Sequence, residues 1–107
     1  MKYYELNAYG ETFKVKVSRT KYCDNNTLAV LLTCDDGEPF GVITTNIHES
    51  TYAANNENAF VDTNNCSWAE KFLTENHLAE YANYRGCSGY CTYPLYHFNI
   101  DLIPEEL

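Results

Sequence analysis

Apolar and polar residues alternate in the first part of the chain, the pattern of β-strands with one buried face. In residues 12–18, every second position from Phe13 to Val17 is apolar, and lysines stand between them. A second strand is expected over residues 2–8 and a tight turn over residues 9–11. The pattern therefore predicts an antiparallel hairpin at the start of the chain.

A nearly continuous apolar run over residues 27–34 predicts a central strand that is covered on both faces. A loop over residues 23–26 precedes it. The Asp-Asp-Gly-Glu-Pro stretch at residues 35–39 is a strong turn sequence. Residues 40–47 are then expected to return as a fourth strand, and the polar residues 48–58 are expected to form a surface loop.

One helix is expected in the second half of the chain. Ser67 and Glu70 have the spacing of a capping box, in which each side chain satisfies a free backbone N–H. Apolar residues four positions apart follow, so one face of the helix should meet the core until it ends near Asn76. The last strand is expected over residues 90–100. Pro94 cannot donate a backbone hydrogen bond, which places this strand at a sheet edge or at a bulge.

The expected elements make a single α+β domain over residues 1–107, an antiparallel sheet of four to five strands with one main α-helix packed on a face. Residues 59–62 are expected to be a short extended piece. The tail over residues 104–107 is expected to be frayed.

The formal net charge of −8 is unevenly distributed. Residues 1–21 carry five cations and two acids, a net +3, whereas residues 22–107 carry two cations and 13 acids, a net −11. An acidic surface repels phosphate backbones, so direct DNA or RNA binding is not expected. Such a protein can instead occupy the basic nucleic-acid groove of a partner, although acidic residues also serve solubility alone.

The chain shows no apolar run long enough for a membrane span and no secretion signal at its N-terminus, so we expect a cytoplasmic protein. Five cysteines at irregular spacing are expected to be reduced there. Ten tyrosines in 107 residues are typical either of an interaction surface or of outward-facing strand positions.

The candidates for catalysis are weak. Cys87 and Cys91 are one loose pair of possible zinc ligands, whereas zinc sites usually combine two tight pairs. Cys87 beside Arg85 is a minimal arrangement for a nucleophile, but the spacing fixes no base against it. Asp62 offers a carboxylate for acid–base chemistry without an evident partner. We therefore predict no catalytic residue, no metal and no cofactor.

Two segments carry the candidate binding groups. Residues 84–98 combine tyrosines, hydroxyls and Arg85 around a Gly-x-x-Gly loop, a set that can stack a ring and hold a phosphate. Residues 62–65 lead into the expected helix and can present polar groups to an anion. The same residues also fit a tight loop with a Tyr-rich edge strand, and a capping loop that satisfies its own backbone. The candidate ligand-binding residues are Asp62, Thr63, Asn64, Asn65, Arg85, Ser88, Tyr90, Thr92, Tyr93 and Tyr96.

Several motifs lie at residues 22–30 and 60–65, at Trp68 with Phe72 and Leu73, and at residues 88–96. They resemble those of a family of proteins of about 110 residues, of unknown function, carried by phages and conjugative elements of gut bacteria. The resemblance covers almost the whole chain and implies the cytoplasm of a bacterial host cell. Where the family has Thr-Gly-Arg, this chain reads Asn83-Tyr84-Arg85, which keeps the arginine in register but changes the turn before it. The resemblance implies a mobile-element setting and brings no established activity.

Small accessory proteins in such a setting are often counter-defence factors. We therefore predict a non-enzymatic protein that binds and sequesters a nucleotide-type immune signal. The alternative is an acidic anti-CRISPR or anti-restriction inhibitor that occupies the nucleic-acid groove of a host defence nuclease. Because one small core leaves few concave sites, a homo-oligomer is expected, with the edge around Pro94 near the contact.

Overall fold

The computed structural model describes residues 2–23, 27–47 and 55–106. Its elements, in chain order, are β1 (Tyr4–Ala8), β2 (Glu11–Lys21), β3 (Leu28–Cys34), β4 (Pro39–Val42), β5 (Thr44–Thr45), β6 (Asn58–Val61), α1 (Ala69–Glu75), β7 (Ala79–Ser88), β8 (Cys91–Phe98) and the 3₁₀-helix η2 (Ile100–Leu102). No helix within these ranges has the length and apolar character needed to cross a membrane.

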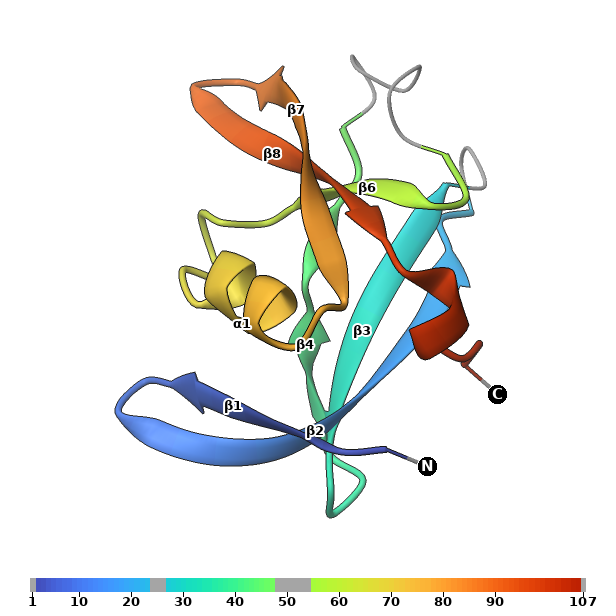
Figure 1. Ribbon diagram of the computed structural model, residues 1–107. Coiled ribbons are helices and arrows are strands. Elements are labelled where there is room, and N and C mark those ends of the chain that lie inside the picture. The colour runs from blue at the N-terminus through green and yellow to red at the C-terminus, as the bar shows by residue number, and fades with distance from the viewer. Residues whose placement is uncertain (1, 24–26, 48–54, 107) are drawn as a thin grey trace.

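The strands form two antiparallel four-stranded sheets, in the orders β1-β2-β3-β4 and β5-β6-β8-β7 (Figure 1). The chain passes from one sheet to the other at Ile43, which lies between β4 and β5. Its N–H donates to the Val30 carbonyl (3.0 Å), and its own carbonyl accepts the Asp62 N–H (2.9 Å). The antiparallel strands and the α-helix agree with the predicted α+β class, but the single sheet of four to five strands is not confirmed.

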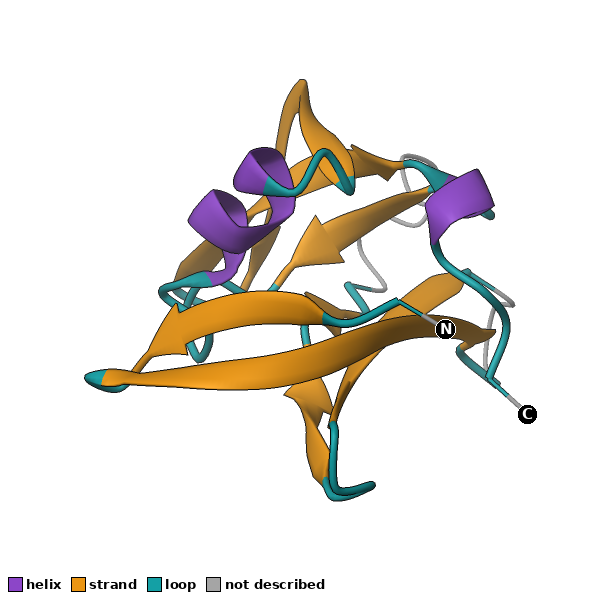
Figure 2. Ribbon diagram, turned by 60° about the horizontal axis from the view of Figure 1, so that its bottom comes forward, coloured by secondary structure: helices purple, strands orange, loops and turns teal. Residues whose placement is uncertain are grey.

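The main core lies between the two sheets, and α1 closes it on one side (Figure 2). Alternation explains which side chains enter it: Leu6 from β1, Val15 and Val17 from β2, and Phe98 from β8 are all buried. The strand β3 lies between β2 and β4, so its central position is confirmed. Its core face is buried, but Leu31 and Thr33 on the other face are only partly buried, so the expected cover on both faces is incomplete. Burial of these apolar faces is the main favourable term in the folding of a domain of this size.

The helix α1 begins and ends close to its predicted bounds, but its capping box does not form. Its N-cap residue is Trp68, and no side chain caps the helix there. The Glu70 carboxylate instead accepts a hydrogen bond from the Tyr96 hydroxyl on β8. The helix ends at Asn76, whose side-chain amide donates to the Phe72 carbonyl (2.8 Å), so the predicted end is confirmed.

The strand β7 was not predicted, because its residues were interpreted partly as a Gly-x-x-Gly loop. It pairs with β8, which therefore lies between β6 and β7 rather than at an edge. Pro94 is tolerated there because the ladder is irregular beside it. The register shifts between Tyr81 and Arg85, and Asn83 has a left-handed φ of 60°. An irregular ladder beside Pro94 is thus present, but its extra residues lie in β7 and not in the strand that holds Pro94, and the predicted edge position is wrong.

The C-terminal segment is held against β2 as far as it is described. The Arg19 N–H donates to the Pro104 carbonyl (2.9 Å), and the Glu106 N–H donates back to the Arg19 carbonyl (2.8 Å). The prediction of a frayed tail is therefore wrong for residues 104–106. Leu107 lies outside the described residues, as do residues 24–26 and 48–54 of the two predicted loops.

Candidate functional site

The hairpin of β7 and β8 carries six of the ten candidate residues and projects from the body of the protein (Figure 1). Its turn is formed by Gly89 and Tyr90, and Gly89 has a left-handed φ of 61°, which glycine adopts without the steric cost that a Cβ imposes. The Tyr90 side chain at the tip is fully exposed, with 108% relative exposure. A large aromatic held in solvent at a turn has no packing role within the chain.

The two faces of the hairpin have different surroundings. Side chains alternate along β8, so that Tyr96 and Phe98 enter the main core beside α1. Leu95 lies on the other face in a second, smaller cluster with Ile47 and Phe60, and Tyr93 packs against that cluster. The candidate residues of this hairpin are therefore divided between a helix-side face and an outer face.

On the helix-side face, Arg85 is an exposed cation without a carboxylate partner. Its guanidinium lies 5.6 Å from the centre of the Tyr81 ring, within range of a cation–π interaction. Among the described residues, no hydrogen bond or ion pair engages its N–H donors. Thr92, also exposed, lies on this face because it pairs with Cys87, two residues along β7 from Arg85. The face therefore offers the planar set of N–H donors of a guanidinium group beside an aromatic ring.

Tyr96 is buried on the same face, and its hydroxyl is already engaged. It donates to the Glu70 carboxylate at 2.6 Å and so ties β8 to α1. Burial, the hydrogen bond and the charge of Glu70 raise the pKa of Tyr96 above its ordinary value, while Arg85 opposes them. As a ligand contact Tyr96 is therefore disfavoured, because binding would have to break this bond.

We expect Tyr96→Phe to lower the free energy of unfolding by about 1.5 kcal/mol, the range for a hydrogen bond to a charged group. Because the folded-state pKa of Tyr96 is raised, its neutral form stabilises the fold below the ordinary tyrosine pKa of about 10, and this stability is lost as the pH rises beyond it. Urea denaturation at pH 7 and pH 11 measures both effects. The difference in the free energy of unfolding between wild type and variant should be smaller at pH 11 than at pH 7. An unchanged difference would contradict the link between the Tyr96 pKa and stability.

On the outer face, the charge of Asp62 acts on Tyr93. The β6–β8 register pairs Phe60 with Leu95, and Asp62 and Tyr93 each lie two residues beyond this pair. Burial, a hydrogen bond with Cys91 and the nearby Cys91 and Asp62 charges raise the pKa of Tyr93. The charge of Asp62 thus reaches the second candidate segment at Tyr93, whose side chain faces away from Arg85.

The polar loop after β6 largely satisfies its own backbone. The Asp62 carboxylate accepts the Asn65 N–H at 3.2 Å and the Asn65 side-chain amide at 3.0 Å, and the Asp62 carbonyl accepts the Cys66 N–H at 2.8 Å. The Thr63 N–H donates to the Val61 carbonyl. This geometry agrees with the alternative interpretation of residues 62–65 as a loop that satisfies its own backbone. The exposed Asn64 side chain is still available to a ligand.

The ten candidate residues thus fall into four places. Arg85, Thr92 and Tyr96 lie on the helix-side face, Tyr93 and Asp62 on the outer face, Ser88 and Tyr90 at the hairpin tip, and Thr63, Asn64 and Asn65 in the loop after β6. No hydrogen bond or ion pair within the described residues joins the Arg85 group to the Asp62 group. A single pocket formed by all ten is not present in one chain, and Arg85 with Thr92 is the pair best placed for a ligand.

The five cysteines are free thiols. Cys87 pairs with Thr92 and Cys91 with Ser88, so these two thiols lie on opposite faces of the hairpin. Within residues 2–23, 27–47 and 55–106, no three His, Cys, Asp or Glu side chains are grouped to hold a metal ion. Burial, and then the charge of Asp62, raise the pKa of the Cys66 thiol, which is the opposite of what an activated nucleophile requires.

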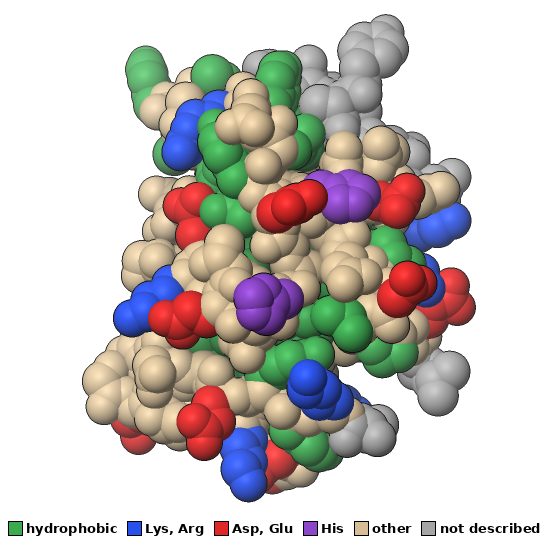
Figure 3. Space-filling view, viewed as in Figure 1, with side chains coloured by type: hydrophobic (Ala, Val, Ile, Leu, Met, Phe, Trp, Pro, Cys, Tyr) green, Lys and Arg blue, Asp and Glu red, His purple; other side chains and the backbone are tan. Residues whose placement is uncertain are grey.

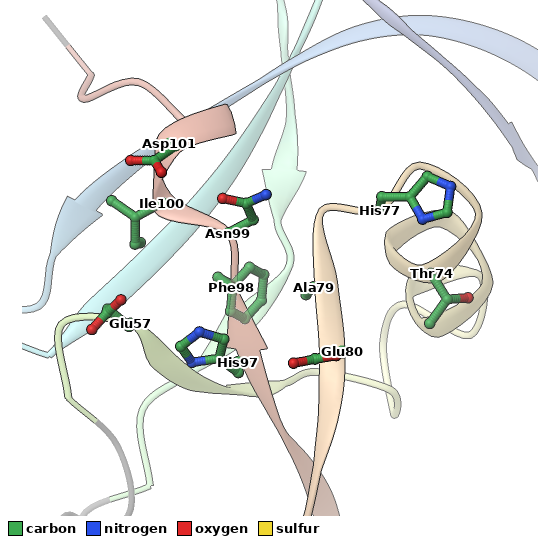
Figure 4. Close-up of a pocket in the computed structure, with 10 residues that line it drawn as sticks. All are labelled: Glu57, Thr74, His77, Ala79, Glu80, His97, Phe98, Asn99, Ile100 and Asp101. Carbon is green, nitrogen blue, oxygen red and sulfur yellow. The ribbon is translucent and has the colours of Figure 1, made fainter.

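A hollow that the sequence did not indicate lies where β7 and β8 meet η2 and the end of α1 (Figure 4). Its volume is about 580 Å³, and its lining is Glu57, Thr74, His77, Ala79, Glu80, His97, Phe98, Asn99, Ile100 and Asp101. Glu80 and His97 are paired across the strands. His97 Nδ1 forms a hydrogen bond of 2.7 Å with the Asn58 side-chain oxygen, which fixes the imidazole ring at the rim of the hollow.

The hollow has an acidic rim. Glu57, Glu80 and Asp101 line it without an ion-pair partner among the described residues, and no lysine or arginine belongs to its lining. Figure 3 shows acidic and histidine side chains gathered on this face of the molecule. The sequence analysis did not predict this hollow because it did not predict β7. Only the pairing of β7 with β8 brings Glu80 next to His97.

Comparison with known proteins gives one match. A family model described as a domain of unknown function, DUF4313, matches residues 15–106. Neither the curated proteins nor the solved structures include a significant match. The matched span contains the loop at Asp62, the β7–β8 hairpin and the acidic hollow, so all three belong to the same domain.

Proposed function

Because the chain belongs to the DUF4313 family, a domain of unknown function, we propose its role from the geometry of its surface: a non-enzymatic protein that binds an anionic ligand on the helix-side face of the β7–β8 hairpin. The observation that carries this proposal is Arg85, an exposed guanidinium stacked on Tyr81 with no carboxylate partner among the described residues. A guanidinium group that forms no hydrogen bond or ion pair with the described residues is available to bind a ligand.

The ligand class that we propose is a nucleotide-type immune signal, sequestered in a counter-defence role. A nucleotide presents a phosphate, which suits the guanidinium fork, and a flat base, which suits an aromatic ring. Tyr81 supplies an exposed ring on this face and Tyr90 an exposed ring at the hairpin tip, whereas the Tyr84 ring lies near Phe60 on the outer face. The phage or mobile-element setting of this role rests on the sequence resemblance.

The site that we propose is completed by a second copy of the chain. Arg85 lies on an exposed strand, whereas small-molecule sites usually bury most of the ligand in a concave pocket. The strand β7 is the outermost strand of its sheet, so a second hairpin can approach it from the open side. Two hairpins facing each other would supply a pair of guanidinium groups to a ligand with two phosphates.

Native mass spectrometry of the purified protein with a panel of cyclic dinucleotides and trinucleotides tests this function. We expect a dimer or larger oligomer at micromolar concentration that retains one member of the panel, and we expect heat denaturation to release that nucleotide chemically intact. A monomer that retains none of them would contradict the proposal. Release of a hydrolysed nucleotide would assign an enzyme instead.

The acidic hollow favours the second candidate, an inhibitor that occupies the basic groove of a host defence nuclease. Its unpaired carboxylates would meet lysines and arginines of the partner and would steer association at low salt. Inhibition of a panel of purified nucleases should then weaken with salt and in an E57Q/E80Q double variant. The matched control is Glu5→Gln on β1, outside this lining. Equal inhibition by all three proteins would exclude this role for the hollow.

A further inference from the structure

A hollow of about 560 Å³ lies on the sheet β1-β2-β3-β4, which the hairpin proposal does not involve. Its lining comes from all four strands of that sheet, from the β3–β4 turn and from the C-terminal segment. The residues are Lys2, Tyr4, Lys16, Val17, Ser18, Leu31, Leu32, Thr33, Gly37, Pro39, Gly41, Val42, Leu102, Pro104, Glu105 and Glu106. Its volume is within the range of about 300–1,000 Å³ usual for small-molecule sites.

The walls of this hollow are largely apolar although they face solvent. The strand register pairs Leu31 with Val42 and with Ser18, which places these three side chains on one face of the sheet. Val42 is 44% exposed, and Leu102, on the C-terminal side of the hollow, is 39% exposed. Apolar side chains that converge on a hollow without being covered favour a ligand with an apolar body.

Two free ammonium groups belong to the same lining. Lys2 lies 5.0 Å from the centre of the Tyr4 ring, and Lys16 is paired with Thr33 across the strands. Neither lysine has a carboxylate partner among the described residues. Of the two lining acids, Glu105 is engaged by Arg19 at 3.5 Å. Five of the seven cations of the chain lie in residues 1–21. Two of them line this hollow together with Glu105 and Glu106, whereas no lysine or arginine lines the acidic hollow at η2.

We propose that this hollow binds an amphipathic anion, and specifically a long-chain carboxylic acid. The acyl chain would lie against Leu31, Val42 and Leu102. Its transfer out of water is the main favourable contribution to the binding free energy of an apolar group. The carboxylate would meet the ammonium group of Lys16, because that of Lys2 lies over the Tyr4 ring, which is buried on the opposite face of the sheet. The hydroxyls of Ser18 and Thr33 are hydrogen-bond donors in the same lining. A carboxylate is the head group that this combination of a cation and hydroxyls recognises.

Displacement of a fluorescent polyene fatty acid by palmitate tests this proposal. We expect Lys16→Gln to weaken palmitate binding about tenfold, as loss of a charge-assisted contact does. The matched control is Lys14→Gln, the same change on the same strand outside the lining, which should leave the affinity within about twofold. Hexadecanol, which has the same chain and no charge, should displace the probe poorly.

Three results would overturn the proposal. Absence of probe binding to the wild type is the first. The second is an equal loss in Lys14→Gln and Lys16→Gln, which would show only diffuse attraction to a basic face. The third is displacement by hexadecanol as effective as that by palmitate. Amide chemical shifts locate the ligand independently: palmitate should move Leu31, Thr33 and Val42 and leave the hairpin residues unchanged. Shifts confined to the hairpin would place the ligand elsewhere.

Discussion

The Phe98→Ala variant should lose about 3–5 kcal/mol of its free energy of unfolding, the usual cost of removing a buried phenylalanine. Phe98 is fully buried in the main core, where side chains of both sheets and of α1 meet. Truncation would leave a cavity between the two sheets that their backbones cannot close without breaking strand pairs. Because small domains are stable by about 5–15 kcal/mol, this single change should remove a large part of the total.

Urea denaturation of the variant measures this loss, provided that the slope of the transition is the same as in the wild type. Tyr90→Ala is the matched control, since it also truncates an aromatic side chain on the same hairpin but at a fully exposed position. Its free energy of unfolding should stay within about 0.5 kcal/mol of the wild type. Equal losses in the two variants would contradict the arrangement of the core between the sheets.

The first half of the fold can be predicted from the sequence because its apolar and polar residues follow regular patterns. The hairpin expected over residues 2–18 is present as β1 and β2, and the apolar run at residues 27–34 is present as β3. In each case the period of the side chains and the environment of the strand agree. The structure extends β2 to Lys21, because its second half pairs with β3 rather than with β1.

The second half of the fold is poorly readable for physical reasons. The strand β7 contains a bulge at which Asn83 takes a left-handed conformation, so no simple period marks it as a strand. The division into two sheets is decided at Ile43, where the chain leaves one sheet and enters the other. A local pattern predicts that a segment is extended, but it does not specify which sheet receives it.

Long-range contacts also decided how much of the candidate site was predictable. Ser67 and Glu70 have the spacing of a capping box, yet Glu70 is engaged by Tyr96, which lies 26 residues further along the chain. The same contact makes a structural residue of a tyrosine that was expected to bind a ligand. Asp62 and Tyr93 were both selected from the sequence, and their proximity follows from a register that only the fold defines.

The Arg85→Ala variant should lose at least about 100-fold in affinity for whichever cyclic nucleotide the wild type retains, while its free energy of unfolding stays within about 0.5 kcal/mol. The affinity falls because the guanidinium is the exposed cation of this face and its donors are otherwise unused. The stability is kept because Arg85 is exposed, lies over the Tyr81 ring and makes no hydrogen bond or ion pair with any described residue. Calorimetric titration measures the affinity, and urea denaturation measures the stability.

Two further variants separate recognition by Arg85 from a general effect of charge. Lys71→Ala removes one cation from α1, where Lys71 pairs only with Glu75 at the surface, and should leave the affinity unchanged. Arg85→Lys keeps the charge but loses the planar fork, so its affinity should lie between those of Arg85→Ala and the wild type. Full affinity in Arg85→Lys would reduce the role of Arg85 to a point charge. Full affinity in Arg85→Ala would contradict the binding of the nucleotide on this face.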